Sequence, residues 1–200
     1  VADGFSSAYL VFYLFIPFLN ILIKGMNKKQ HLMLIALCIG TYTILSTLLI
    51  PVVFNYVTWF SVIYIIGAYM RIYPEAWFSS RKIWGIAALI SLLLSWGSVL
   101  AGALIMTRFG INLCYYFVAD SNKPLALLTA ICAFMFFKNL NIGYSKVINT
   151  IAASAYGVLL IHANSDIMRQ WLWKDTLRNV DFLNSNLLVI HAVCSVIGIY

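Results

Sequence analysis

The chain has 200 residues, of which 63% are apolar and only 10% are charged, and its formal net charge is +7. Soluble domains carry roughly 25% charged and about 45–50% apolar residues, so the composition excludes an ordinary water-soluble fold and indicates a membrane protein. The basic balance does not indicate a nucleic-acid partner, because excess Lys and Arg mark the cytoplasmic loops of membrane proteins.

Long apolar runs without the alternation of barrel strands predict an all-α polytopic membrane bundle of about seven transmembrane helices. The fifth run is short, at ~21 Å, and spans only if Lys123 and Lys138 snorkel to the two surfaces. Residues 107–123 form an interfacial or a re-entrant piece, since charges flank an apolar middle. We treat the whole chain, 1–200, as one helical domain. In chain order, the expected helices cover residues 8–24, 32–54, 57–73, 83–106, 124–138, 147–163 and 187–200.

The distribution of charge predicts the orientation of these helices. If the loop that contains Lys24, Lys28 and Lys29 is cytoplasmic, alternate loops place eight basic residues and one acid, Glu75, on that side. The other side then has five basic and five acidic residues. Basic residues mark the cytoplasmic face, so we expect a multi-pass cell-membrane protein with an external start and a cytoplasmic C-terminus.

The two ends of the sequence indicate a fragment of a longer membrane protein. The chain opens with Val1 and has no signal peptide pattern. It stops at Tyr200, about 15 residues into an apolar run, where about 20 are needed to span.

The stretch 154–173 is the first candidate for chemistry, because it brings His162 to a membrane edge. Asp166 lies four residues later and would orient this imidazole if the helix continues that far. Ser154 is ~12 Å away along the axis, too far for a nucleophile–base hydrogen bond, which disfavours a serine-hydrolase triad. A second histidine, His191, has a simpler interpretation as a locally hydrogen-bonded residue near a helix start.

Arg71, at the expected cytoplasmic end of its helix, is either a snorkelling anchor or a contact for a phosphate-bearing donor. Trp59, Trp171 and Trp173 are either interfacial belt residues or part of a sugar-binding mouth. The sequence has no Gly-rich phosphate loop, no HExxH motif and no metal-ligand cluster, so we expect no metal site.

Three segments together resemble the acyltransferase-3 family of integral membrane O-acyltransferases. The first is YLVFYLFIPFLN (Tyr9 to Asn20), and the second is WFSVIYIIGAYMR (Trp59 to Arg71). The third joins FFKNL (Phe136 to Leu140) to SAYGVLLIH (Ser154 to His162). Their order and spacing extend over nearly all of the chain.

The resemblance implies an enzyme of about ten membrane helices, of which this chain holds the last seven. Such an enzyme moves an acyl group, often acetyl, from cytoplasmic acyl-CoA to a hydroxyl of a surface or lipid-linked glycan. Family catalysis is associated with an Arg…His pair in the first helix, and no helix here carries that pair. The principal base is therefore expected outside this chain, and the fragment alone is expected to be inactive.

On this interpretation, His162 and Asp166 support catalysis and Arg71 contacts the donor. Trp59, Tyr156, Trp171 and Trp173 are candidates for the acceptor side. No cofactor is bound; acyl-CoA is a co-substrate, and the partners are membrane lipid and glycan. The alternative is a transporter or flippase without acyl-transfer chemistry, since broken helices also suit transporter sites. The sequence just before Val1 would discriminate: an Arg-then-His helix favours the enzyme, and an inverted repeat the transporter.

Overall fold

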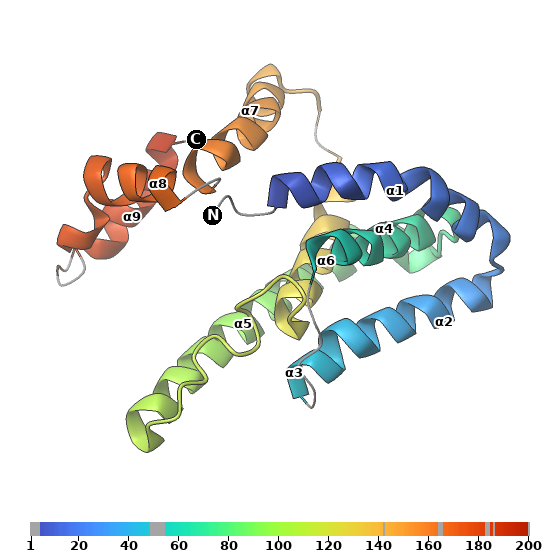
Figure 1. Cartoon of the computed structure of the whole chain (residues 1–200), viewed down its shortest axis with the longest axis horizontal. Helices are drawn as coiled ribbons and strands as arrows, with labels where there is room; N and C mark the ends of the chain where they lie inside the picture. Colours follow the sequence, from blue (N-terminus) through green and yellow to red (C-terminus); the bar gives the residue numbers. More distant parts are fainter. Residues whose placement is uncertain are drawn as a thin grey trace. The chain divides into compact units, whose positions relative to one another are not determined.

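The computed structural model describes residues 5–48, 55–141, 143–163, 166–182, 185 and 187–199, and every regular element among them is helical. The chain forms two units, one of Val11–Asn141 and the other of Val1–Leu10 with Ile142–Tyr200. The elements of the first unit are α1 (Phe5–Gly25, which begins in the other unit), α2 (Lys28–Ile39), η1 (Gly40–Leu45), α3 (Ser46–Leu48), α4 (Tyr56–Ile72), η2 (Ala76–Ser79), α5 (Arg81–Phe109) and α6 (Pro124–Lys138). Figure 1 shows them in sequence colours from blue to yellow.

Three helical stretches among the described residues are long and apolar enough to cross a membrane: Ser6–Gly25, Lys28–Leu48 and Arg81–Phe109. Tyr56–Ile72 and Pro124–Lys138 are shorter apolar helices. Large apolar side chains of α1 such as Leu14 and Phe18 are about 70% exposed, as expected where lipid is the solvent. The all-helical membrane fold is confirmed, whereas seven crossings remain a prediction.

Local signals in the sequence define where the helices begin and end. Asn27 and Gln30 form a capping box, in which each side chain accepts a hydrogen bond from the other residue's backbone N–H. The α2 helix therefore begins at Lys28, four residues before the expected start. Asn55 caps α4 by accepting from the backbone N–H of Val57 at 2.8 Å. At the end of α5, Gly110 takes the left-handed conformation, with φ of 71°, that a glycine C-cap allows.

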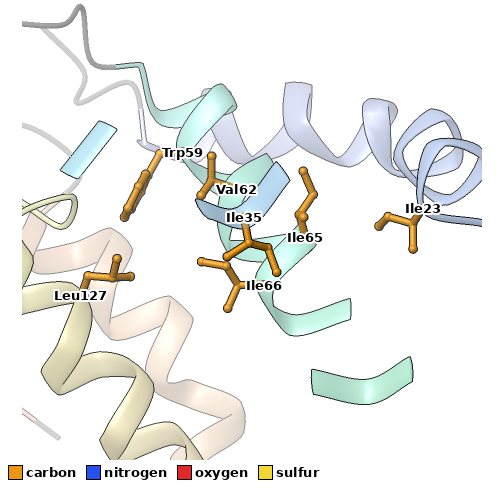
Figure 2. Packing of buried hydrophobic residues seen from close by; sticks show 7 residues of the cluster. All are labelled: Ile23, Ile35, Trp59, Val62, Ile65, Ile66 and Leu127. Carbon is orange, nitrogen blue, oxygen red and sulfur yellow. The ribbon is translucent and has the colours of Figure 1, made fainter. Parts of the chain in front are cut away.

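One hydrophobic cluster of this unit lies where α4 meets α2, with contributions from α1 and α6, and a second joins η2, α5 and α6. Figure 2 shows Ile35 of α2 directed at Ile65 and Ile66 of α4, with Leu127 of α6 below Trp59. Ile23 of α1 and Val62 of α4 complete this cluster of buried residues. The core therefore fixes α4 between its neighbours, which matters for the site described below.

A non-helical segment, residues 111–123, returns along α5. A Cβ atom added to Gly102 would lie only 2.5 Å from the Leu113 carbonyl oxygen, so the two backbones touch. The Tyr116 hydroxyl donates to the Thr47 carbonyl, and Asn122 Nδ2 donates to the Tyr42 carbonyl at 2.8 Å. The segment therefore packs on α5, η1 and α3, and both interpretations of residues 107–123, interfacial and re-entrant, stay predictions.

The second unit is described by itself. Its elements are α7 (Lys146–Ala163), α8 (Asp166–Arg169), the π-helical η3 (Gln170–Thr176), η4 (Asn179–Phe182) and α9 (Leu188–Ile199). The α7 and α9 helices fall on the expected ranges 147–163 and 187–200. Expected helix 32–54 extends into residues 49–54, which lie outside the described part of the chain.

Candidate functional site

A groove of about 490 Å³ lies between α1 and α4. Both helices end beside it, α1 at Gly25 and α4 at Ile72. In the predicted orientation, this is the cytoplasmic end of both. The lining residues are Asn20, Ile23, Lys24, Ile63, Tyr64, Gly67, Ala68, Arg71 and Ile72.

The groove is held open by contacts between the two helices. The Tyr64 hydroxyl donates to Asn20 Oδ1 at 2.7 Å. Further along, the ring of Phe12 packs against Phe60 and Tyr64 with centroid distances of 5.7 and 5.9 Å. Gly67 has no heavy atom within 4 Å of an added Cβ, so its missing side chain leaves room for a ligand. The groove is therefore polar at Asn20 and Tyr64 and open at Gly67.

Two cations, Lys24 and Arg71, line the groove, each in the last turn of its helix. Both side chains are exposed, and the structure shows no ion pair from either to an acid in the described residues. Glu75 is instead bound by Lys28, with Nζ and Oε1 2.5 Å apart. The groove therefore has the charge to bind an anion, and the Arg71 guanidinium has the planar fork that fits phosphate.

A buried histidine of α2 packs against the opposite face of α4, and it is not among the site residues predicted from the sequence. His31 of α2 is fully buried, and its Nε2 lies 2.9 Å from the Ile65 carbonyl oxygen. Its ring meets Tyr69 and Tyr73 edge-on at centroid distances of 5.3 and 6.0 Å. The Asn27–Gln30 capping pattern was the signal that could have placed His31 inside a helix instead of a loop.

The tryptophans expected on the acceptor side have different environments. Trp59 is 3% exposed and lies in the core beside α2 and α6, so packing is its observed role. In the second unit, Trp171 is about half exposed and Trp173 is partly buried, both within η3. Trp59 does not line the groove, and an acceptor-side role remains a prediction for all three tryptophans.

The stretch 154–173 is described only in part. Tyr156 and His162 belong to α7 and Asp166 begins α8, but the side chains of these residues lie outside the described part. The proposed pairing of His162 with Asp166 therefore stays a prediction. Ser154 Oγ donates to the Ile151 carbonyl of its own helix at 2.9 Å, an ordinary intrahelical bond.

His191 is locally bonded, in line with the simpler interpretation of it. Its Nδ1 lies 3.1 Å from Ser195 Oγ, one helical turn later, and the centroid of its ring lies 3.8 Å from that of Phe182, with the two rings tilted by 53°. These residues border a cavity of about 400 Å³ within the second unit.

Comparison with known proteins identifies the family. A family model described as an acyltransferase domain, that of the acyltransferase-3 family, matches residues 5–200. No curated protein and no solved structure matches the chain significantly. Because the matched region covers almost the whole sequence, the chain belongs to the acyltransferase-3 family of membrane acyltransferases.

Proposed function

We propose that this chain forms part of an O-acyltransferase that moves an acyl group, acetyl in the simplest case, from cytoplasmic acyl-CoA to a hydroxyl of a cell-surface or lipid-linked glycan. The family assignment supports acyl transfer in a membrane. The donor, the acceptor and the cytoplasmic C-terminus are parts of the proposal.

The main support for the proposal is that two of the segments that resemble the acyltransferase-3 family meet at one groove. The first ends at Asn20 and the second includes Tyr64, Gly67 and Arg71, and all four residues line one groove. The Asn20–Tyr64 hydrogen bond joins the segments directly, although they are 44 residues apart in sequence. Residues from two separate segments that resemble the family thus line the same groove as Lys24.

The charge of the groove suits the donor and not the glycan acceptor. Coenzyme A carries a diphosphate and a 3′-phosphate, which Lys24 and Arg71 would bind through charge-assisted hydrogen bonds. A neutral glycan offers no such groups. We therefore assign the groove between α1 and α4 to the nucleotide half of acyl-CoA, with Arg71 as the principal contact.

In the proposed reaction, a general base removes the proton of the acceptor hydroxyl, and the oxygen attacks the thioester carbonyl carbon. The carbon–sulfur bond then breaks, and the leaving thiolate takes up a proton. We assign no residue of this chain as the base, since the Arg…His helix that the resemblance implies has no counterpart in the sequence. His162, with Asp166, is proposed to support the outer, acceptor side.

The test is acyl transfer by membranes that contain the full-length protein, with radiolabelled acetyl-CoA and label followed into glycan. Arg71→Ala should raise the KM for acetyl-CoA by about tenfold, the value expected for one charge-assisted hydrogen bond. Arg81→Ala is the matched control, because Arg81 begins α5 and does not line the groove. If the two variants raise the KM equally, this groove is not the donor site.

Two further measurements test the remaining parts of the proposal. His162→Ala should lower the rate of acyl transfer to glycan. If the rate is unchanged, His162 does not support the reaction. A cysteine placed at Lys24 in a cysteine-free background should react with a membrane-impermeant maleimide only from the cytoplasmic side. Should wild type transfer label to no glycan tested, a transporter or flippase becomes the better hypothesis.

A further inference from the structure

We propose that His31 is a positioning residue that fixes the rotation of α4 and thereby keeps Arg71 in the groove. This inference rests on the proposed function, because it assigns His31 an effect on donor binding.

The hydrogen bond of His31 has a defined direction. A carbonyl oxygen only accepts, so the 2.9 Å contact with Ile65 requires the proton on Nε2 of His31. A carbonyl has two lone pairs, so Ile65 can accept this bond as well as the bond within its own helix. The ring is fully buried, and Nδ1 has no hydrogen-bond partner among the described residues. Nε2–H is therefore the group through which the ring holds α4.

Aromatic contacts hold the imidazole against one face of α4. Ile65, Tyr69 and Tyr73 follow one another at intervals of four residues, so they lie on the same side of the helix. Tyr69 and Tyr73 present their rings edge-on to His31, with interplanar angles of 87° and 74°. The nearby Lys28–Glu75 ion pair is about half exposed and lies beyond the end of α4, so it adds little to the hold on the helix.

Arg71 projects from the other side of the same helix. It lies two residues after Tyr69, which corresponds to about 200° around the axis at 3.6 residues per turn. A rotation of α4 by about 20° would move a group at its ~5.5 Å surface radius by about 2 Å. A displacement of that size is enough to misplace a cation relative to a bound phosphate. His31 thus acts on the groove through the helix and not by touching the ligand.

Two variants of the full-length protein separate the hydrogen bond from the packing. His31→Phe keeps a ring of similar size and removes the donor, together with the unpartnered Nδ1, so the protein should still fold. His31→Gln keeps an N–H at the same number of bonds from Cα as Nε2. We expect His31→Phe to weaken binding of adenosine 3′,5′-bisphosphate to membranes by about fivefold, the effect of one lost hydrogen bond, and His31→Gln to restore most of it.

A second readout tells a positioning role from a merely structural one. His31→Phe should raise the KM for acetyl-CoA and leave transfer from a short acetyl thioester without the nucleotide unchanged. In the Arg71→Ala background, His31→Phe should not raise the KM for acetyl-CoA further, because the contact between Arg71 and the donor phosphate is already absent. Equal losses with both donors, or additive losses in the double variant, would overturn the inference.

The outcomes also separate this inference from the proposed function. If wild type binds the nucleotide and His31→Phe binds it equally well, His31 does not position Arg71, and the donor site stands. If wild type neither binds the nucleotide nor transfers an acyl group, the donor site and the role of His31 both fail.

Discussion

Gly102 in α5 offers a quantitative test of the fold, because another backbone lies directly against it. A Cβ at this position would lie 2.5 Å from the Leu113 carbonyl oxygen and 2.7 Å from Cys114 Cα. Both are backbone atoms, so no side-chain rotation relieves the contact. Ordinary van der Waals separation requires segment 111–123 to move away by roughly 1 Å. Overpacking of this kind costs about 1–3 kcal/mol, against ~0.5–1 kcal/mol gained when Ala replaces Gly in a helix.

Gly102→Ala should therefore lower the free energy of unfolding by about 1–2 kcal/mol. Gly97→Ala is the matched control, since it lies in the same helix and an added Cβ meets nothing within 4 Å. It should be neutral or slightly stabilising. The assay is denaturant unfolding of the purified full-length protein in detergent, with the labelling rate of Cys114 as a local readout. If Gly102→Ala is as stable as Gly97→Ala and Cys114 labels no faster, the fold-back along α5 is wrong.

Three more substitutions test other contacts of the same unit by the same unfolding assay. Tyr64→Phe removes the 2.7 Å bond to Asn20 and should cost about 1 kcal/mol, and a neutral result would mean that the bond does not join α1 to α4. Lys28→Ala breaks the ion pair with Glu75 but should leave stability nearly unchanged, since both side chains are about half exposed. Asn139→Leu removes donors to two backbone carbonyls, at 2.6 and 2.8 Å, and should cost about 1–3 kcal/mol; wild-type stability would contradict both bonds.

Composition and apolar run length were enough to predict a helical membrane protein, and the segments around Asn20, Tyr64 and His162 were enough to indicate the family. Helix starts were less predictable. Hydropathy predicts that α2 starts at Leu32, after the last polar residue, whereas the Asn27 cap begins the helix at Lys28. Hydropathy alone marks where a run becomes apolar, and a capped first turn can still be charged.

Which faces of the helices pack together could not be predicted from the sequence. In water, a helix shows its packed face as an apolar stripe, but a helix in lipid is apolar on all sides. The α4 helix illustrates this, because Ile65 and Ile66 are buried while Ile63 and Ile72 are exposed. For the same reason Arg71 could be interpreted as an anchor or as a ligand contact, and only the pairing of α1 with α4 places it in a groove.

The electrostatics of this groove depend on which cation the Glu75 carboxylate contacts. Glu75 is the only acidic residue on the predicted cytoplasmic side, and it lies four residues after Arg71 in the sequence. A free carboxylate there would reduce the positive potential offered to a phosphate. The 2.5 Å contact with Lys28 directs Glu75 toward α2 instead. Even where this exposed ion pair contributes little to stability, it leaves Lys24 and Arg71 as the charges that a donor meets. Because both cations are exposed, that attraction is screened by salt, so the KM for acyl-CoA should rise with ionic strength in wild type and less in Arg71→Ala.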